Sequence, residues 1–191
     1  EGYQYAIEND FSKVEIANNY IQNGRYPVAS WHAGVVVDLN VHHNVFDRIM
    51  QPDGILLFSG APRNLTFENN TVLYDEKAFN FNGPKEGNCV LSIKVPVNID
   101  KISVRNNIFY CYDGDKKNNV PLIQIPAGTS ITATNVVIDN NAFYNWTPDG
   151  TNVIEAPAGS PMFKLSGKTY TDKYGLQQES VCYGKNLGAI N

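Results

Sequence analysis

The chain has 191 residues, a formal net charge of −4 and a pI near 5.3. This balance provides no basic patch for a nucleic-acid partner, and the sequence holds no apolar run long enough to span a bilayer. Asparagine, glycine, tyrosine and phenylalanine are frequent, with 24, 15, 11 and 9 residues respectively, and no long stretch has helical periodicity. These features favour strands and turns.

The sequence predicts several short apolar strands, each of which we expect to open one repeating unit of the chain. We call them the first strands. The candidates for these first strands are 5–8, 34–38, 54–58, 90–95 and 122–126, with 153–156 as a sixth. The connections that lead into them are long, at 22–31, 74–88 and 110–120. Long loops on a rigid scaffold concentrate binding residues, so we expect a cleft on the face made by the first strands and these loops.

One short pattern follows the first strands and recurs five times. Each copy alternates apolar and polar residues, continues into a pair of asparagines and ends on an apolar residue. The copies are 14–21, 39–46, 65–72, 102–109 and 136–143. Alternation with period 2 is strand spacing, and repeats separated by 25 to 37 residues are typical of stacked supersecondary units. We therefore predict an all-β solenoid in which each copy belongs to one coil.

The paired asparagines predict a sharp corner at the end of each copy. Asparagine adopts left-handed backbone conformations at low cost, and His43, which replaces the first asparagine of the second pair, is expected at a corner too. The second member of the pair is asparagine in every copy, at Asn19, Asn44, Asn70, Asn107 and Asn141. We expect these side chains to face the interior and to stack as an asparagine ladder.

The repeat ends near residue 157. We divide the domain into coils at 1–157 and a C-terminal capping segment at 158–191, because a solenoid needs an atypical terminal segment over the edge of its last coil. The first coil begins almost directly at Glu1, without a cap of its own. We therefore expect its open edge to be covered by preceding β-helix coils or by another chain.

Several motifs together resemble one known family. They are the five asparagine segments, the strand starts Gly34-Val35 and Gly54-Ile55, and the ending Ser160-Pro161 with Leu187-Gly188-Ala189. Over nearly its whole length the chain resembles the right-handed parallel β-helix proteins of the pectate-lyase-like superfamily, in particular the C-terminal portion of secreted bacterial members. This resemblance implies a right-handed parallel β-helix that is secreted or at the cell surface, with a polysaccharide partner. The scaffold hosts many activities.

Three outward residues of the expected first strands are candidates for catalysis. With 5–8 and 34–38 taken as first strands of adjacent coils about 4.8 Å apart, Glu8 and Asp38 would be neighbours, and Lys94 would lie two coils above Asp38. Two adjacent carboxylates suit Ca²⁺, so Glu8 and Asp38 are also the predicted metal ligands. The resemblance implies lyase chemistry, in which such an ion neutralises a uronate carboxylate while Lys94 removes the C5 proton.

Other interpretations of these charges stay open. A pair of carboxylates about 6.5–9.5 Å apart would serve inverting hydrolysis, and charged residues on an outward strand face are usually only solvated. The sequence lacks the motif set of the polygalacturonase-type hydrolases and the dense aspartate cluster of the calcium pectate lyases.

Four further residues are predicted to bind substrate. Tyr26, Trp31 and His32 lie in or beside the connection 22–31, where the aromatic rings would serve as stacking platforms for sugar rings. Arg63 lies near another connection, and arginine binds acidic groups in a bidentate manner.

The sequence leaves three functions open. The first is a lyase of an acidic polysaccharide, or a portion of one. The second is a non-catalytic glycan-binding or cell-surface β-helix module. The third is a structural fibre segment, against which the irregular loops argue, because fibres favour uniform coils.

Overall fold

A computed structural model provides the structure of the chain. It describes residues 5–8, 12–23, 26–30, 36–49, 56–58, 61–74, 91–93, 99–111, 117–121, 123–124, 136–144, 146–149, 163–164 and 169–190. Within these ranges the fold is all-β with parallel strand pairs, apart from one short helix, α1 (Tyr170–Tyr174), and one isolated antiparallel bridge between Phe163 and Leu176.

Fifteen of the strands form three parallel sheets of five strands each. Sheet A contains β1 (Tyr5–Glu8), β4 (Tyr26–Ser30), β7 (Leu56–Phe58), β10 (Leu91–Ile93) and β14 (Ile123–Gln124). Sheet B contains β2 (Lys13–Ala17), β5 (Val36–His42), β8 (Ala61–Glu68), β11 (Lys101–Arg105) and β15 (Val136–Asp139). Sheet C contains β3 (Tyr20–Gln22), β6 (Val45–Ile49), β9 (Thr71–Tyr74), β12 (Ile108–Cys111) and β16 (Ala142–Tyr144). A separate parallel pair joins β13 (Lys117–Pro121) to β17 (Trp146–Asp149).

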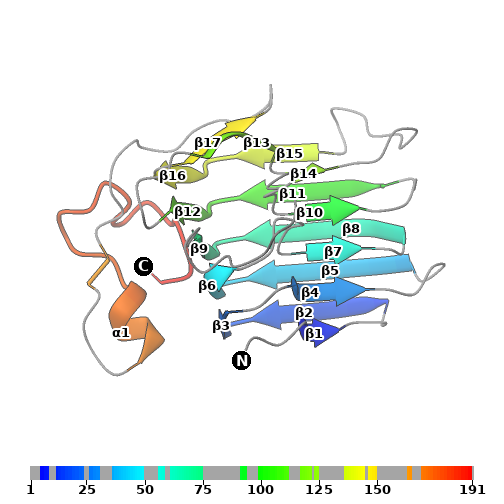
Figure 1. The fold of residues 1–191 in the computed structure, drawn as a ribbon, viewed down its shortest axis with the longest axis horizontal. Coiled ribbons are helices and arrows are strands. Elements are labelled where there is room, and N and C mark those ends of the chain that lie inside the picture. The colour runs from blue at the N-terminus through cyan, green and yellow to red at the C-terminus, as the bar shows by residue number, and fades with distance from the viewer. Residues whose placement is uncertain are drawn as a thin grey trace, which may run out of the picture.

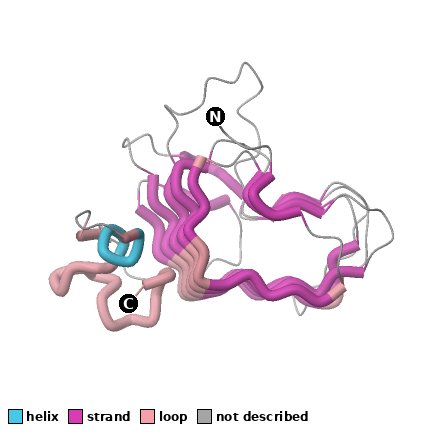
Figure 2. The backbone as a smooth tube through the Cα atoms, turned by 90° about the horizontal axis from the view of Figure 1, so that it is seen from below, coloured by secondary structure: helices cyan, strands magenta, loops and turns pink. Residues whose placement is uncertain are grey.

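Each stretch of chain contributes one strand to each sheet in turn. The first unit is β1, β2 and β3, the last is β14, β15 and β16, and neighbouring units pair in chain order through all three sheets (Figure 1). Viewed along the stack, the strands of each sheet superpose, and the turns between sheets B and C lie in one column (Figure 2). The predicted all-β fold with parallel sheets is confirmed.

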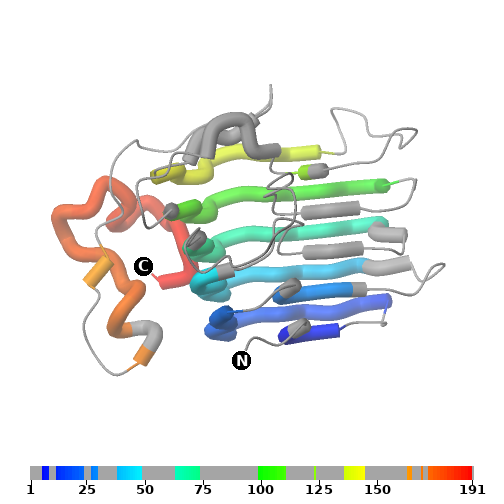
Figure 3. Tube along the Cα trace, in the orientation of Figure 1, coloured from blue at the N-terminus to red at the C-terminus, as the bar shows by residue number. Residues whose placement is uncertain are grey.

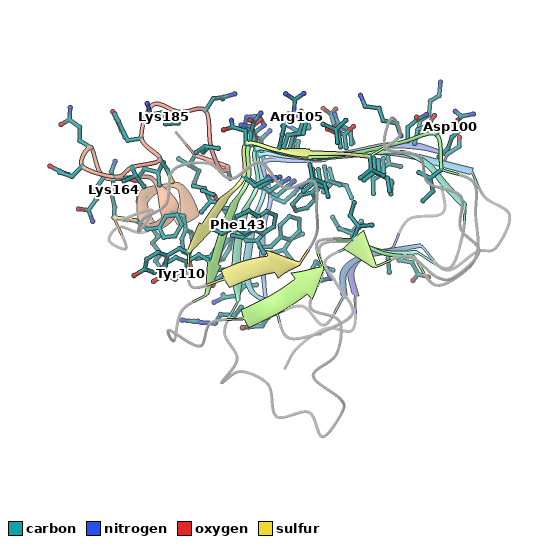
Figure 4. All side chains as sticks on the ribbon, turned by 90° about the horizontal axis from the view of Figure 1, so that it is seen from above. Asp100, Arg105, Tyr110, Phe143, Lys164 and Lys185 are labelled. Carbon is teal, nitrogen blue, oxygen red and sulfur yellow. The ribbon has the colours of Figure 1, made fainter. Side chains whose placement is uncertain are left out.

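The interior of the stack is apolar because strand alternation turns every second side chain inward. On β5, Leu39 and Val41 are buried, whereas Asn40 between them is exposed. Aromatic rings stack across units inside the stack, with ring centroids 5.8 Å apart for Phe46 and Phe67. Figure 4 shows Phe143, which stacks on Phe109 at 5.2 Å, pointing between the sheets.

Each turn from sheet B to sheet C is made by a residue in the left-handed region. The φ values at these corners lie between 50° and 59°, at Asn18, His43, Asn69, Asn106 and Asn140. Asparagine tolerates this conformation better than most residues with a side chain. His43 occupies the second corner, as predicted.

The residue after each corner points into the stack, and these asparagines form a hydrogen-bonded column, which we call the asparagine column. The backbone N–H and the side-chain Nδ2 of Asn44 both donate to Oδ1 of Asn70, at 3.0 and 3.1 Å. Asn70 donates in the same way to Asn107, and Asn107 to Asn141. Asn44, Asn70, Asn107 and Asn141 have no exposed surface. Each buried amide therefore bonds to neighbouring units, and Asn44 and Asn70 also donate to a backbone oxygen of their own unit, at His42 and Glu68.

The chain after residue 163 packs against the outer face of sheet C. In Figure 3 this orange-to-red segment lies beside units that precede it by more than a hundred residues. A second apolar cluster forms there from sheet C side chains such as Leu73 and Ile108 together with Phe163, Leu176 and Leu187. The described part of the predicted cap thus lies along the side of the stack, and the division at residue 157 stays a prediction.

A glycine and a buried carboxylate fix this C-terminal segment. Gly188 has φ 77° and its N–H donates to the backbone oxygen of Asn106, and a Cβ added there would lie 2.6 Å from Ile108. The Tyr20 and Tyr174 hydroxyls donate to Oδ2 of the buried Asp47, at 2.8 and 2.7 Å. Burial and the Asp47 carboxylate raise the pKa of Tyr20, which keeps its hydroxyl a donor.

The predicted first strand 34–38 of the second unit is wrong. The strand that enters sheet A is β4, at Tyr26–Ser30, within the predicted long connection 22–31, and β5 begins only at Val36 in sheet B. Burial decides this, because Val28 and Ala29 are fully enclosed. The sequence signal was misleading because Pro27 lacks a backbone donor and argues against a central strand. Segment 153–156 lies outside the described residues.

Substitution of Asn107 by leucine tests the asparagine column. Leucine has a similar size but removes the side-chain acceptor of the Asn70 N–H and the side-chain donor to the Phe67 oxygen, and it leaves Asn141 Oδ1 with only the backbone N–H of residue 107. We expect the free energy of unfolding to fall by about 1–3 kcal/mol, measured by urea denaturation. The exposed Asn40→Leu is the matched control and should change it little. Equal stability of Asn107→Leu and the unmodified chain would contradict a structural role for the column.

Candidate functional site

The outward face of sheet B is a polar surface built by strand alternation. Residues between the buried apolar positions project to solvent from every strand, and Figure 4 shows Asp100 and Arg105 at two ends of this face. The described polar side chains of this face are Lys13, Glu15, Asp38, Asn40, His42, Asn64, Thr66, Glu68, Lys101, Ser103, Arg105 and Asp139. Parallel strands about 4.8 Å apart repeat these groups at regular intervals.

An open groove of about 510 Å³ lies on this face over β2, β5 and β8, and we call it the sheet B groove. Its polar lining residues are Lys13, Glu15, Asp38, Asn40, Asn64 and Thr66. Asn40 and Thr66 make no side-chain hydrogen bond within the described part of the chain. Their polar groups are available to a ligand that lies in the groove.

Asp38 and Arg63 form an ion pair at one end of the groove. The Arg63 guanidinium donates from Nη2 to Oδ2 of Asp38 at 2.6 Å and from Nε to Oδ1 at 3.1 Å, and Asn64 donates to Oδ1 at 2.9 Å. The hydrogen bonds from Arg63 and Asn64 hold the pKa of Asp38 below its usual value. Arg63 also lies 3.9 Å from Asp100. The structure therefore brings together two of the residues that the sequence singled out.

The predicted neighbours Glu8 and Asp38 are not brought together. Glu8 lies on β1 in sheet A opposite Ala29, whereas Asp38 lies on β5 in sheet B between Lys13 and Asn64. The prediction is wrong because it took 34–38 as a first strand. The two carboxylates predicted to hold Ca²⁺ therefore lie in different sheets, and a role for Ca²⁺ stays a prediction. Within the described ranges no three histidine, cysteine, aspartate or glutamate side chains cluster as metal ligands.

Three other predicted site residues, Lys94, Trp31 and His32, lie outside the described residues. Tyr26 is the first residue of β4 and pairs with Tyr5, so its backbone belongs to a central strand of sheet A and not to a loop. The roles predicted for these four residues stay predictions.

A second polar constellation borders the groove and was not predicted. Nε2 of His42 lies 2.7 Å from Oε1 of Glu15, and Nδ1 of His42 lies 2.9 Å from Nδ1 of His43. Burial and the neighbouring His42 lower the pKa of His43. The repeat offered a signal, because His42-His43 replaces a polar residue and an asparagine at the one corner that departs from the pattern.

Two further interactions join charged residues of this face to their neighbours. Arg105 donates from Nε to Oδ1 of Asp139 at 2.7 Å, and Ser103 donates to Oε1 of Glu68 at 2.8 Å. Such exposed pairs contribute little to stability. These pairs place positive and negative side chains next to one another, so charges of both signs alternate on the face.

Removal of the arginine tests the ion pair at Asp38. We expect Arg63→Gln to raise the pKa of Asp38 toward its ordinary value, followed by an NMR titration of the side-chain carboxyl carbon. A lowered pKa in the folded state stabilises the fold above the unfolded-state pKa, and this contribution is lost as the pH falls through the folded-state pKa. Arg105→Gln, which removes the pairing with Asp139, is the control. An unchanged Asp38 titration in Arg63→Gln would contradict the pairing.

Comparisons with known proteins give no assignment. Neither protein-family models, nor curated proteins, nor solved structures provide a match for this chain. Among the described residues, no helix has the length and apolar character to cross a membrane. We therefore infer a function from the geometry of the sheet B face.

Proposed function

We propose that the chain is a right-handed parallel β-helix, a solenoid of the pectate-lyase-like kind, and that the asparagine column is the ladder of this fold. Three observations support the proposal. Five units stack in chain order, all three sheets are parallel, and a left-handed asparagine or histidine makes each turn from sheet B to sheet C. Each unit buries its apolar face only against its neighbours, as in other repeat architectures.

We further propose that the chain is a glycan-binding β-helix module that holds a polysaccharide in the sheet B groove. The observation that carries this proposal is the open groove itself, with the amide of Asn40 and the hydroxyl of Thr66 available beside paired charges. Sugar hydroxyls are both donors and acceptors, and amides, hydroxyls and carboxylates are their complements. An open groove across parallel strands suits an extended chain more than a compact small molecule.

Binding fits the geometry better than the lyase mechanism. Proton abstraction requires a base held within reach of the substrate, and the predicted lyase site combined Lys94 as this base with Glu8 next to Asp38. Lys94 lies outside the described residues. These two carboxylates lie in different sheets, and the Asp38 carboxylate is occupied by Arg63 and Asn64. A polysaccharide ligand is consistent with a place of action outside the cell or at its surface, which we propose on the resemblance alone.

The first unit offers an edge on which further strands fit. Strands β1, β2 and β3 are each terminal in their sheets. In the asparagine column each unit donates to Oδ1 of the next, so Oδ1 of Asn19 accepts no hydrogen bond from the described residues. We propose that preceding β-helix coils or another chain add strands to this edge and donate to Asn19.

Binding to oligosaccharides tests the proposed function. Titration calorimetry with acidic and neutral oligosaccharides should detect binding, and the double variant Asn40→Ala with Thr66→Ala should weaken it about tenfold through the loss of two hydrogen bonds. Gln178→Ala, an exposed substitution on the C-terminal segment, should bind like the unmodified chain. Failure to bind any of these ligands would contradict the proposal, and absorbance from unsaturated products would favour the lyase instead.

Light scattering together with mass spectrometry tests the proposed edge partner. An unpaired edge of three parallel strands is a template for association. We therefore expect the 191-residue chain to show a mass that rises with concentration, or to purify with a second polypeptide. A monodisperse single chain over the whole concentration range would show that the edge needs no partner.

A further inference from the structure

Three titratable groups form a continuous chain beside the sheet B groove. The Glu15 carboxylate lines the groove and accepts a hydrogen bond from Nε2 of His42 at 2.7 Å, and His42 in turn contacts His43. The Glu15 side chain is 66% exposed and the His42 side chain 24% exposed. The proton state of the histidines is therefore linked through one carboxylate to the surface that a ligand would touch.

Only one proton fits between the facing Nδ1 atoms of the two imidazole rings. The two Nδ1 atoms are 2.9 Å apart and the ring centroids 5.1 Å apart, so the rings meet nearly head-on through these nitrogens. An N–H···N hydrogen bond needs one donor and one acceptor. Glu15 as a carboxylate fixes the His42 proton on Nε2, which leaves Nδ1 of His42 as the acceptor and Nδ1 of His43 as the donor.

This arrangement sets how many further protons the pair takes up. One more proton fits on Nε2 of His43, which has no hydrogen bond to the described residues. A second would place hydrogens on both facing Nδ1 atoms and break the contact. The chain Glu15, His42 and His43 therefore carries a charge of −1 when the pair is neutral and 0 after it gains one proton.

The charges that face this chain come from both neighbouring strands and from the corner. Glu15 projects from β2, Glu68 lies opposite His42 on β8, and His43 occupies the turn. Within the groove, Lys13 is positive, and Asp38 is neutralised by Arg63. The other charges near the groove belong to groups whose ordinary pKa values lie far from that of imidazole. The histidine pair is therefore the described group whose charge changes first as the pH falls, and this change lies below the ordinary imidazole pKa because burial and His42 lower the pKa of His43.

We propose that the His42–His43 pair sets the charge preference of the sheet B groove, so that the groove binds anionic glycans more tightly at acidic pH. This inference rests on the proposed glycan-binding function. One proton on the pair offsets the Glu15 carboxylate, and the groove then presents Lys13 without an opposing unpaired acid. A neutral glycan gains nothing from this change, so the groove shifts its preference toward acidic sugars.

The pH dependence of binding tests the proposal. Calorimetry with an oligogalacturonate should show affinity that rises roughly fivefold from pH 7.5 to pH 5.0, the effect of one nearby charge, whereas a neutral oligosaccharide should show no change. The double variant His42→Gln with His43→Asn should keep the pH 7.5 affinity at both values. It should fold, because asparagine occupies this corner in the other four units. Glu15→Gln should bind the oligogalacturonate at pH 7.5 as tightly as the unmodified chain does at pH 5.0.

A second measurement needs no ligand and separates the two proposals. Imidazole ¹⁵N NMR of the unmodified chain should show His42 protonated on Nε2 and His43 on Nδ1 at pH 7.5, with uptake of one proton by the pair between pH 7.5 and 5.0. Two independently titrating rings would overturn the shared-proton arrangement. Oligogalacturonate binding that is equal at both pH values overturns the charge preference alone, and absence of binding to all oligosaccharides overturns the proposed function and the preference with it.

Discussion

The asparagine column is the constraint on which the rest of the structure depends. A turn between sheets B and C leaves backbone groups pointing into an apolar interior, where an unmet polar group costs about 1–3 kcal/mol. Each buried asparagine meets this need as an acceptor, through Oδ1, and as a donor, through N–H groups that reach the neighbouring units. Asn107, for example, donates to Asn141 in the next unit and to the Phe67 oxygen in the preceding one. The corners are therefore held in register, and so are the strands on both sides.

Fixed corners make sheet B a regular polar surface. Every sheet B strand ends at the same position relative to its corner. Inward residues such as Leu65 and Ile102 are therefore in register, and so are the outward residues beside them. The outward groups then meet across strands as pairs, as Asp38 meets Arg63 and Arg105 meets Asp139. The sheet B groove is the region where this pairing leaves Asn40 and Thr66 available.

The second corner links this scaffold to the groove. Histidine in place of asparagine keeps the left-handed turn, with φ 53°, but it adds an ionisable ring that reaches the neighbouring His42. Through His42 the corner contacts Glu15 at the groove. His43 thus keeps the structural role of the asparagine that it replaces but changes the chemistry of the outward face. A local departure from a repeat is informative for this reason.

The sequence alone determined the strand alternation, the corner at His43 and the inward position of the five asparagines at 19, 44, 70, 107 and 141. Each of these features depends on local backbone geometry or on a period of two. The sequence did not determine which apolar run joins sheet A in the second unit. Pro27 argues against a strand at β4, and Gly34 followed by valines resembles the start of one. For the same reason Glu8 and Asp38 were placed together, although they belong to different sheets. Only the tertiary structure decided the pairing of Asp38 with Arg63, the contact of Glu15 with His42 and the packing of the C-terminal segment on sheet C. These contacts join residues about 25 to more than a hundred positions apart, and the register between units, which no local signal encodes, brings them together.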